Sequence, residues 1–127
     1  MNRTEEVANT IVKAIQKKSR ISSWDICKEI TIAKHAGCYI RLRPCHADEL
    51  DMDDLATLST STKSANTELM NLGYKEHNAF LGYKLPDVDG EELFQKILKA
   101  CDEEHKKLCG MTNSALDYSL YIQKEVR

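Results

Sequence analysis

Glycine and proline are scarce in this chain, and their scarcity limits the available folds more than any other feature. The 127 residues include five glycines and two prolines. Collagen-like chains, linkers and folds made of many short strands and tight turns need more of both residues. Apolar residues make up 42% of the chain and charged residues 30%, which is typical of a globular protein. Length and composition therefore predict a single helix-rich domain over residues 1–127.

Apolar residues recur at intervals of three and four in several segments, as they do in amphipathic helices. The predicted helices cover residues 4–19, 22–36, 52–58, 62–72 and 90–109. Polar side chains stand where N-caps are expected, with Thr4 before the first helix, Asp51 before the third and Asp89 before the last. Gly73 follows the fourth helix and is a natural C-terminal stop.

Period-two alternation, which is typical of strands, begins at residue 38. Cys38, Ile40 and Leu42 point one way, while Tyr39, Arg41 and Arg43 point the other. Residues 74–85 predict a hairpin around the polar Glu-His-Asn sequence at 76–78. Residues 114–126 fit either a strand or a helix, and their alternation favours a strand. The predicted fold class is therefore α+β, with a short antiparallel sheet.

Charge is unevenly distributed along the chain. The net charge is −2, but residues 1–43 carry +5, residues 44–85 carry −4 and residues 86–127 carry −3. Such a dipolar molecule can orient a charged partner, although solvated helix faces give the same pattern. No apolar stretch is long enough to span a membrane, and the first residues lack the apolar region of a signal peptide. We therefore expect a cytoplasmic protein with no membrane partner and with its five cysteines reduced.

Metal binding and catalysis find little support in the motifs. Cys101, His105 and Cys109 stand at steps of four, but eight helical residues span about 12 Å, too far for one zinc ion. A buried helix face explains this spacing better, and the chain has no C-x-x-C. Phosphate-binding glycine loops and the nucleophile elbow are also absent. We predict no metal, no cofactor and no catalytic site, while a Cys–His pair formed in three dimensions stays open.

The middle of the chain resembles the winged-helix family in its predicted order of elements. Residues 22–85 give a helix, a strand, two helices separated by a Ser/Thr-rich turn, and a hairpin. The resemblance implies that the helix over 62–72 would enter the DNA major groove, with Thr62, Lys63, Asn66 and Thr67 facing the nucleic acid. It also implies that Lys75 and Lys84 would lie on the wing. The basic residues Lys17, Lys18 and Arg20 would contact phosphates from outside this module.

Two functional hypotheses follow. In the first, the chain is a small non-enzymatic regulatory or inhibitor protein that binds another protein through Tyr39, Arg41 and Arg43. These residues share one strand face and give a mixed aromatic and basic surface. In the second, it is a winged-helix-like DNA-binding regulator. A two-fold homodimer is compatible with both hypotheses.

Overall fold

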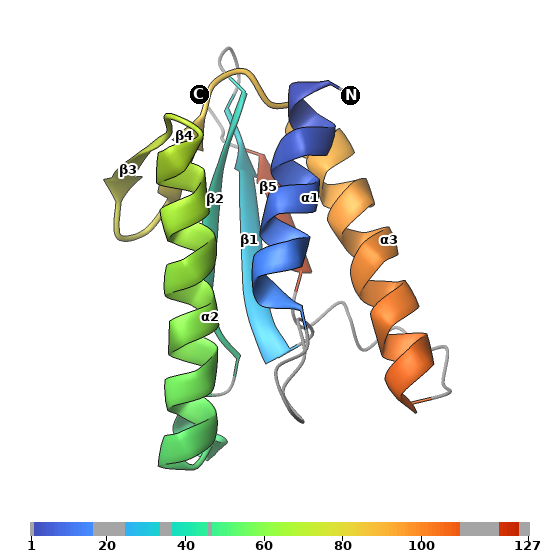
Figure 1. Cartoon of the computed structure of the whole chain (residues 1–127). Helices are drawn as coiled ribbons and strands as arrows, with labels where there is room; N and C mark the ends of the chain where they lie inside the picture. The colour runs from blue at the N-terminus through green and yellow to red at the C-terminus, as the bar shows by residue number, and fades with distance from the viewer. Residues whose placement is uncertain (1, 17–24, 34–36, 46, 110–119, 125–127) are drawn as a thin grey trace.

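The protein has a five-stranded sheet with three helices on one of its faces (Figure 1). The computed structural model describes residues 2–16, 25–33, 37–45, 47–109 and 120–124. In chain order the elements are α1 (Arg3–Ile15), β1 (Ile26–Ile32), β2 (Cys38–Pro44), the 3-10 helix η2 (Ala47–Glu49), α2 (Met52–Asn71), β3 (Lys75–Asn78), β4 (Gly82–Leu85), α3 (Gly90–Cys109) and β5 (Leu120–Lys124). The predicted α+β class is confirmed.

The strands lie in the order β3-β4-β2-β1-β5. Neighbours are antiparallel from β3 to β1, whereas β5 is parallel to β1. Ile30 of β1 lies opposite Ile40 of β2, and Ile40 lies opposite Tyr83 of β4. This register places a row of large apolar side chains on one face of the sheet.

The core lies between this face and the helices. Ile26, Ile30, Ile40 and Leu42 of the two central strands are buried within it. The helices contribute Val7, Ile11 and Ile15 from α1, Leu58, Ala65 and Leu69 from α2, and Leu93, Ile97 and Cys101 from α3. Side chains alternate along a strand, so Cys27, Glu29 and Arg41, which stand between the core-facing positions of β1 and β2, point to the opposite face. None of those intervening residues belongs to the core cluster.

The first helix begins one residue earlier than the sequence predicts. Asn2, rather than Thr4, is the N-cap, and its side chain accepts a hydrogen bond from the Glu5 N–H at 2.8 Å. Thr4 is buried inside the first turn, where its hydroxyl accepts a hydrogen bond from the Asp89 N–H at 3.1 Å. Asn and Thr are both suitable N-cap residues. Because Thr4 is buried and bonded to the loop before α3, Asn2 is the residue that caps the helix.

The predicted helix over residues 22–36 is wrong for residues 26–32, which form β1. Ile26 and Ile30 are four residues apart, and this spacing fits both a helix face and one side of a strand. Lys28 stands between them at a core-facing position and is fully buried. Because it is a charged residue where an apolar one is expected, the alternation of apolar and polar residues that marks a strand is not visible in the sequence. β-branched residues favour the strand.

The sequence also predicts separate helices over 52–58 and 62–72, but α2 is continuous from Met52 to Asn71. Its Ser/Thr-rich segment bonds to the helix backbone instead of forming a turn. The hydroxyls of Thr57 and Thr60 donate to the carbonyls of Asp53 and Ala56, four residues earlier. With β1 in place of a helix and α2 unbroken, the described residues do not have the winged-helix arrangement predicted for 22–85.

The remaining elements follow the sequence prediction. Strands β3 and β4 form the predicted hairpin, but its turn lies after Asn78, whose side chain accepts from the N–H groups of Phe80 and Leu81. Asp89 caps α3 by accepting from the N–H groups of Glu91 and Glu92. Within the ambiguous 114–126 segment, residues 120–124 form a strand, as its alternation favours.

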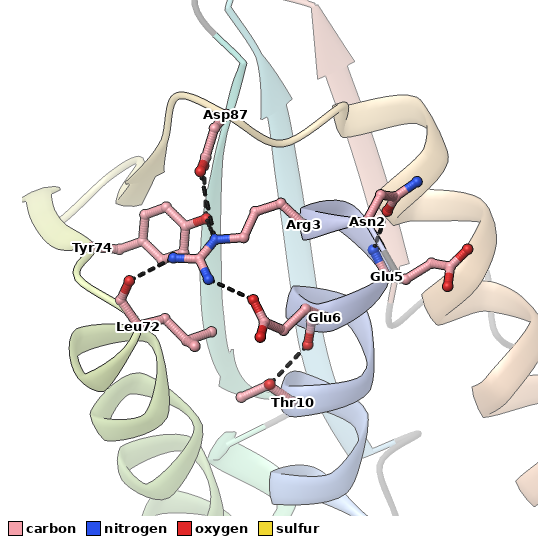
Figure 2. Close-up of polar contacts among 8 residues, drawn as sticks. All are labelled: Asn2, Arg3, Glu5, Glu6, Thr10, Leu72, Tyr74 and Asp87. Carbon is pink, nitrogen blue, oxygen red and sulfur yellow. Dashed lines mark hydrogen bonds and ion pairs between the residues drawn. The ribbon is translucent and has the colours of Figure 1, made fainter.

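A hydrogen-bonded cluster around Arg3 joins the start of α1 to two distant segments (Figure 2). Arg3 Nε donates to the Tyr74 hydroxyl at 2.8 Å, and Nη2 donates to the Leu72 carbonyl at the end of α2 at 2.6 Å. The Tyr74 hydroxyl in turn donates to Asp87 Oδ1 at 2.6 Å. The guanidinium also lies 5.1 Å from the Tyr74 ring centroid and pairs with Glu6. The cluster thereby fixes α1 against both the α2–β3 and the β4–α3 connections.

We expect Tyr74→Phe to lower the free energy of unfolding by about 1–3 kcal/mol, because it removes hydrogen bonds to two charged partners. Burial, followed by the bond to Asp87, raises the pKa of Tyr74 to about 12 from the ordinary 10.0. Between these pH values the folded protein keeps a proton that the unfolded chain releases, so this stabilising contribution falls as pH rises. Urea unfolding of both proteins should show their difference narrowing from pH 10 to 12. If the difference in the free energy of unfolding stays constant over this range, the pKa of Tyr74 is not raised in the folded protein.

Two glycines with positive φ provide a second, internally controlled prediction. A Cβ at Gly82 (φ +78°) would stand 2.1 Å from the Ile40 carbonyl oxygen, whereas at Gly73 (φ +100°) it would meet nothing within 4 Å. We expect Gly73→Ala to cost only the left-handed backbone penalty, about 1–2 kcal/mol. Gly82→Ala must also separate β4 from β2, and should cost at least about 3 kcal/mol. Equal losses in chemical denaturation would show that the close approach to Ile40 does not matter.

Candidate binding surface

The face of the sheet opposite the helices carries the residues that the sequence predicts to bind a partner. We call this surface the open face and define it by the outward positions of β1 to β4, namely Cys27, Glu29, Thr31, Tyr39, Arg41, Arg43, Lys75, His77 and Lys84. Helices α1, α2 and α3 all lie on the other side of the sheet (Figure 1). The predicted grouping of Tyr39, Arg41 and Arg43 on one side of a strand agrees with the register of β2.

Charges on the open face are predominantly positive. Arg41, Arg43, Lys75 and Lys84 are cations, and Glu29 is the one carboxylate among the strand positions that define this face. The side chains of Arg41 and Arg43 are 37% and 45% exposed, and both lysines are exposed. A chain with net charge −2 therefore presents a local basic surface.

Glu29 orients the two arginines. Its Oε1 accepts from Arg43 Nε at 2.9 Å and from Arg43 Nη2 at 2.8 Å. Its Oε2 lies 4.0 Å from Arg41 Nη1. The bond to Glu29 raises the pKa of Arg43 above its ordinary value. Arg43 is thus held by two close contacts with Glu29, whereas Arg41 approaches the same carboxylate only to 4.0 Å.

Lys75 and Lys84 face each other directly across β3 and β4. Like charges in opposite positions of an antiparallel pair repel one another. Neither lysine forms an ion pair with a described residue. Lys84 is also opposite Tyr39 on the neighbouring strand, so the lysine pair continues the basic surface that begins at Arg41. An anionic group above these residues would relieve the repulsion.

On the open face, the side chain of Tyr39 packs against its neighbours and leaves little surface accessible to a partner. It is only 9% exposed, and its ring centroid lies 5.0 Å from that of His77, with the two planes at 46°. His77 is exposed on the edge strand and covers the tyrosine ring. The aromatic part of the predicted surface is therefore an intramolecular contact, and a partner meets the imidazole of His77 before the ring of Tyr39.

The residues of the nucleic-acid hypothesis do not gather in one place among the described residues. Lys63, Asn66 and Thr67 lie on α2, where Lys63 and Thr67 are exposed and Asn66 is half-buried. They are on the helix side of the sheet, separate from the open face. Lys17, Lys18 and Arg20 fall outside the described residues.

Sequence reasoning missed the roles of Glu29 and His77, and it assigned Lys75 and Lys84 to a DNA-contacting wing. Glu29 was concealed because residues 26–32 match a helical apolar spacing. The lysines and His77 require the register between β3, β4 and β2, which no short pattern in the sequence specifies. Alternation in β2 was the one signal that led to the open face.

Comparisons with known proteins give no information on function, so the fold and the open face are the basis for inferring it. No protein-family model, curated protein or solved structure matches this chain. In the part of the chain that the structure describes, no three side chains of His, Cys, Asp or Glu gather in a group that could hold a metal ion. Within the same residues, no helix has the length and apolar character needed to cross a membrane.

Proposed function

We propose that this protein acts by binding another protein, and that its open face receives an acidic surface of that partner. The observation that carries the proposal is the presence of four cations and a single carboxylate on a sheet face that no described helix covers. Complementary charge guides such encounters and fixes the orientation of the partners. The corresponding class of function is a small regulatory or inhibitory protein that occupies an acidic surface.

Arg41 and the lysine pair are the residues best suited to contact the partner. Arginine presents a planar set of donors that matches carboxylate geometry, and Arg41 is only loosely associated with Glu29. Lys75 and Lys84 already repel one another, so a carboxylate placed between them relieves an existing cost. Arg43, which is bonded twice to Glu29, supports the surface and stiffens it.

A protein partner fits this surface better than a nucleic acid. Single-stranded nucleic acids are commonly bound by exposed aromatic rings on which bases stack, and the Tyr39 ring is buried beneath His77. The carboxylate of Glu29 stands among the cations and would repel a continuous phosphate backbone. An acidic protein surface with separated carboxylates can avoid Glu29 while it engages Arg41 and the lysines.

Charge reversal on the open face provides the test. We expect Arg41→Glu/Lys84→Glu to weaken binding of a fluorescein-labelled glutamate-rich peptide at least about tenfold, which is about 1.4 kcal/mol. The matched control is Lys63→Glu/Lys99→Glu, which makes the same change in net charge at exposed positions of α2 and α3. This control should bind within about twofold of the original protein. Fluorescence anisotropy at low and moderate salt gives the affinities, and amide chemical shifts locate the peptide.

Two results would contradict the proposal. Equal weakening in both double variants would mean that only the net charge matters. Tighter binding of single-stranded or duplex DNA than of the peptide, with shifts at the same residues, would assign the open face to nucleic acid. Arg43 stays unchanged in these variants because it makes the two close contacts that hold Glu29 in place.

A further inference from the structure

Cys27 and Cys45 are paired at the end of the β1–β2 ladder. Cys27 lies opposite Arg43 in the register of the two strands. Cys45 follows β2, and its N–H donates to the Asp25 carbonyl at 2.8 Å, so the ladder continues one pair beyond Ile26 and Pro44. The two cysteines are therefore diagonal neighbours on the same face of the two strands, and each thiol influences the pKa of the other. Both are free thiols in the structure.

Charged groups surround this thiol pair. The ammonium of Lys28, which is fully buried, interacts electrostatically with both thiols, and the guanidinium of Arg43 interacts with Cys27. Glu29 Oε1, which holds Arg43, lies 3.8 Å from Cys27 Sγ. Positive charge near a thiol favours its thiolate form. The two cations thus favour the thiolate of Cys27, and the carboxylate of Glu29 opposes it.

The two thiols have opposite electrostatic tendencies. The hydrogen bond from Cys45, followed in size by the opposing effect of burial, leaves the pKa of Cys27 below its ordinary value. The same hydrogen bond, together with burial, raises the pKa of Cys45. Of the two thiols, Cys27 is therefore the more readily deprotonated, and in the structure its Sγ–H donates to Glu29 Oε1. Cys27 is buried, whereas Cys45 is partly exposed, so small solutes reach the pair from the Cys45 side.

We propose that Cys27 and Cys45 are a redox-active pair that a peroxide converts into an intramolecular disulfide. The geometry supplies the main requirement, since the register makes the two side chains diagonal neighbours on one face of adjacent strands. Thiolates that stand beside a second, resolving cysteine are the ones that oxidise reversibly. The thiol pair shares Glu29 and Arg43 with the open face, but the inference does not depend on the binding of a partner there.

The reaction balances with hydrogen peroxide as the oxidant. The Cys27 thiolate attacks one peroxide oxygen, the O–O bond breaks, and the second oxygen leaves as hydroxide and takes up a proton to become water. Cys27 is then a sulfenic acid. The Cys45 sulfur attacks the Cys27 sulfur, the S–O bond breaks, and the departing hydroxyl leaves as water with the Cys45 proton. Two thiols have lost two electrons and two protons, and the peroxide has become two waters.

Other cysteines of the chain serve as controls. Cys38 is buried in the core beneath the helices, and burial raises the pKa of its thiol to about 12. Such a thiol is inert towards peroxide. Cys101 is buried on α3 and interacts with Lys28 from the helix side, which makes it the alternative partner to exclude.

The test begins with the reduced, folded protein and hydrogen peroxide, followed by intact mass and peptide mapping. We expect a loss of two hydrogen atoms, a crosslink between the peptides of Cys27 and Cys45, loss of two titratable thiols, and full reversal by dithiothreitol. Cys38→Ala and Cys101→Ser should each retain the crosslink. Cys45→Ala should prevent it and leave a sulfenic acid on Cys27 that reacts with dimedone. The crosslink should form more slowly in urea, where the fold no longer holds the thiols together.

Several outcomes would overturn the inference. They are a disulfide to Cys101, a disulfide between two molecules, oxygen addition to Cys45 without a crosslink, or equal rates in the folded and the unfolded protein. Because the principal measurement uses the unaltered protein, it does not depend on the folding of any variant.

Discussion

One-sided burial of the sheet is the constraint on which the rest of the structure depends. The row formed by Ile30, Ile40 and Tyr83 must be covered by apolar surface, and α1, α2 and α3 all supply it from the same side. Burial of such side chains contributes about 25 cal/mol per Å² of apolar area. A shift of register by one residue would expose this row and bury Arg41 and Glu29. The apolar face therefore fixes the register, and the register in turn assembles the charged face.

Lys28 is the exception within that buried face. It lies opposite Leu42 and is fully buried, so its charge is taken out of water. Burial lowers its pKa, while the nearby thiols of Cys101, Cys45 and Cys27 and the carboxylate of Glu104 act in the opposite direction. Cys101 and Glu104 belong to α3, whereas Cys27 and Cys45 lie at the end of the β1–β2 ladder. Lys28 therefore interacts with both the helix layer and the sheet. The charged residue that makes β1 hard to predict from the sequence thus interacts with residues distant from it in the chain.

Local chemistry was sufficient to predict much of this fold. The caps Asp51 and Asp89, the alternation of β2, the hairpin and the long last helix each depend on residues close together in the sequence. β1 and the continuity of α2 could not be predicted in this way. The choice for β1 depends on tertiary burial of Lys28, and the choice for α2 depends on tertiary burial of Ser61 and Thr62 within the Ser/Thr-rich segment. For the binding surface, alternation predicted Tyr39, Arg41 and Arg43, but Lys84 and Glu29 join them only through cross-strand register.

The parallel pairing of β5 with β1 has a consequence for the order in which the fold is completed. The β1–β2 and β3–β4 pairs each join strands that are close in sequence, and such local contacts form early. The second edge of β1 is instead covered by Leu120–Lys124, from the far end of the described chain. During synthesis, β1 therefore keeps an unpaired edge until almost all of this sequence has left the ribosome. An unpaired strand edge is a template for association with other chains, so the interval before β5 docks is when this protein is most exposed to aggregation.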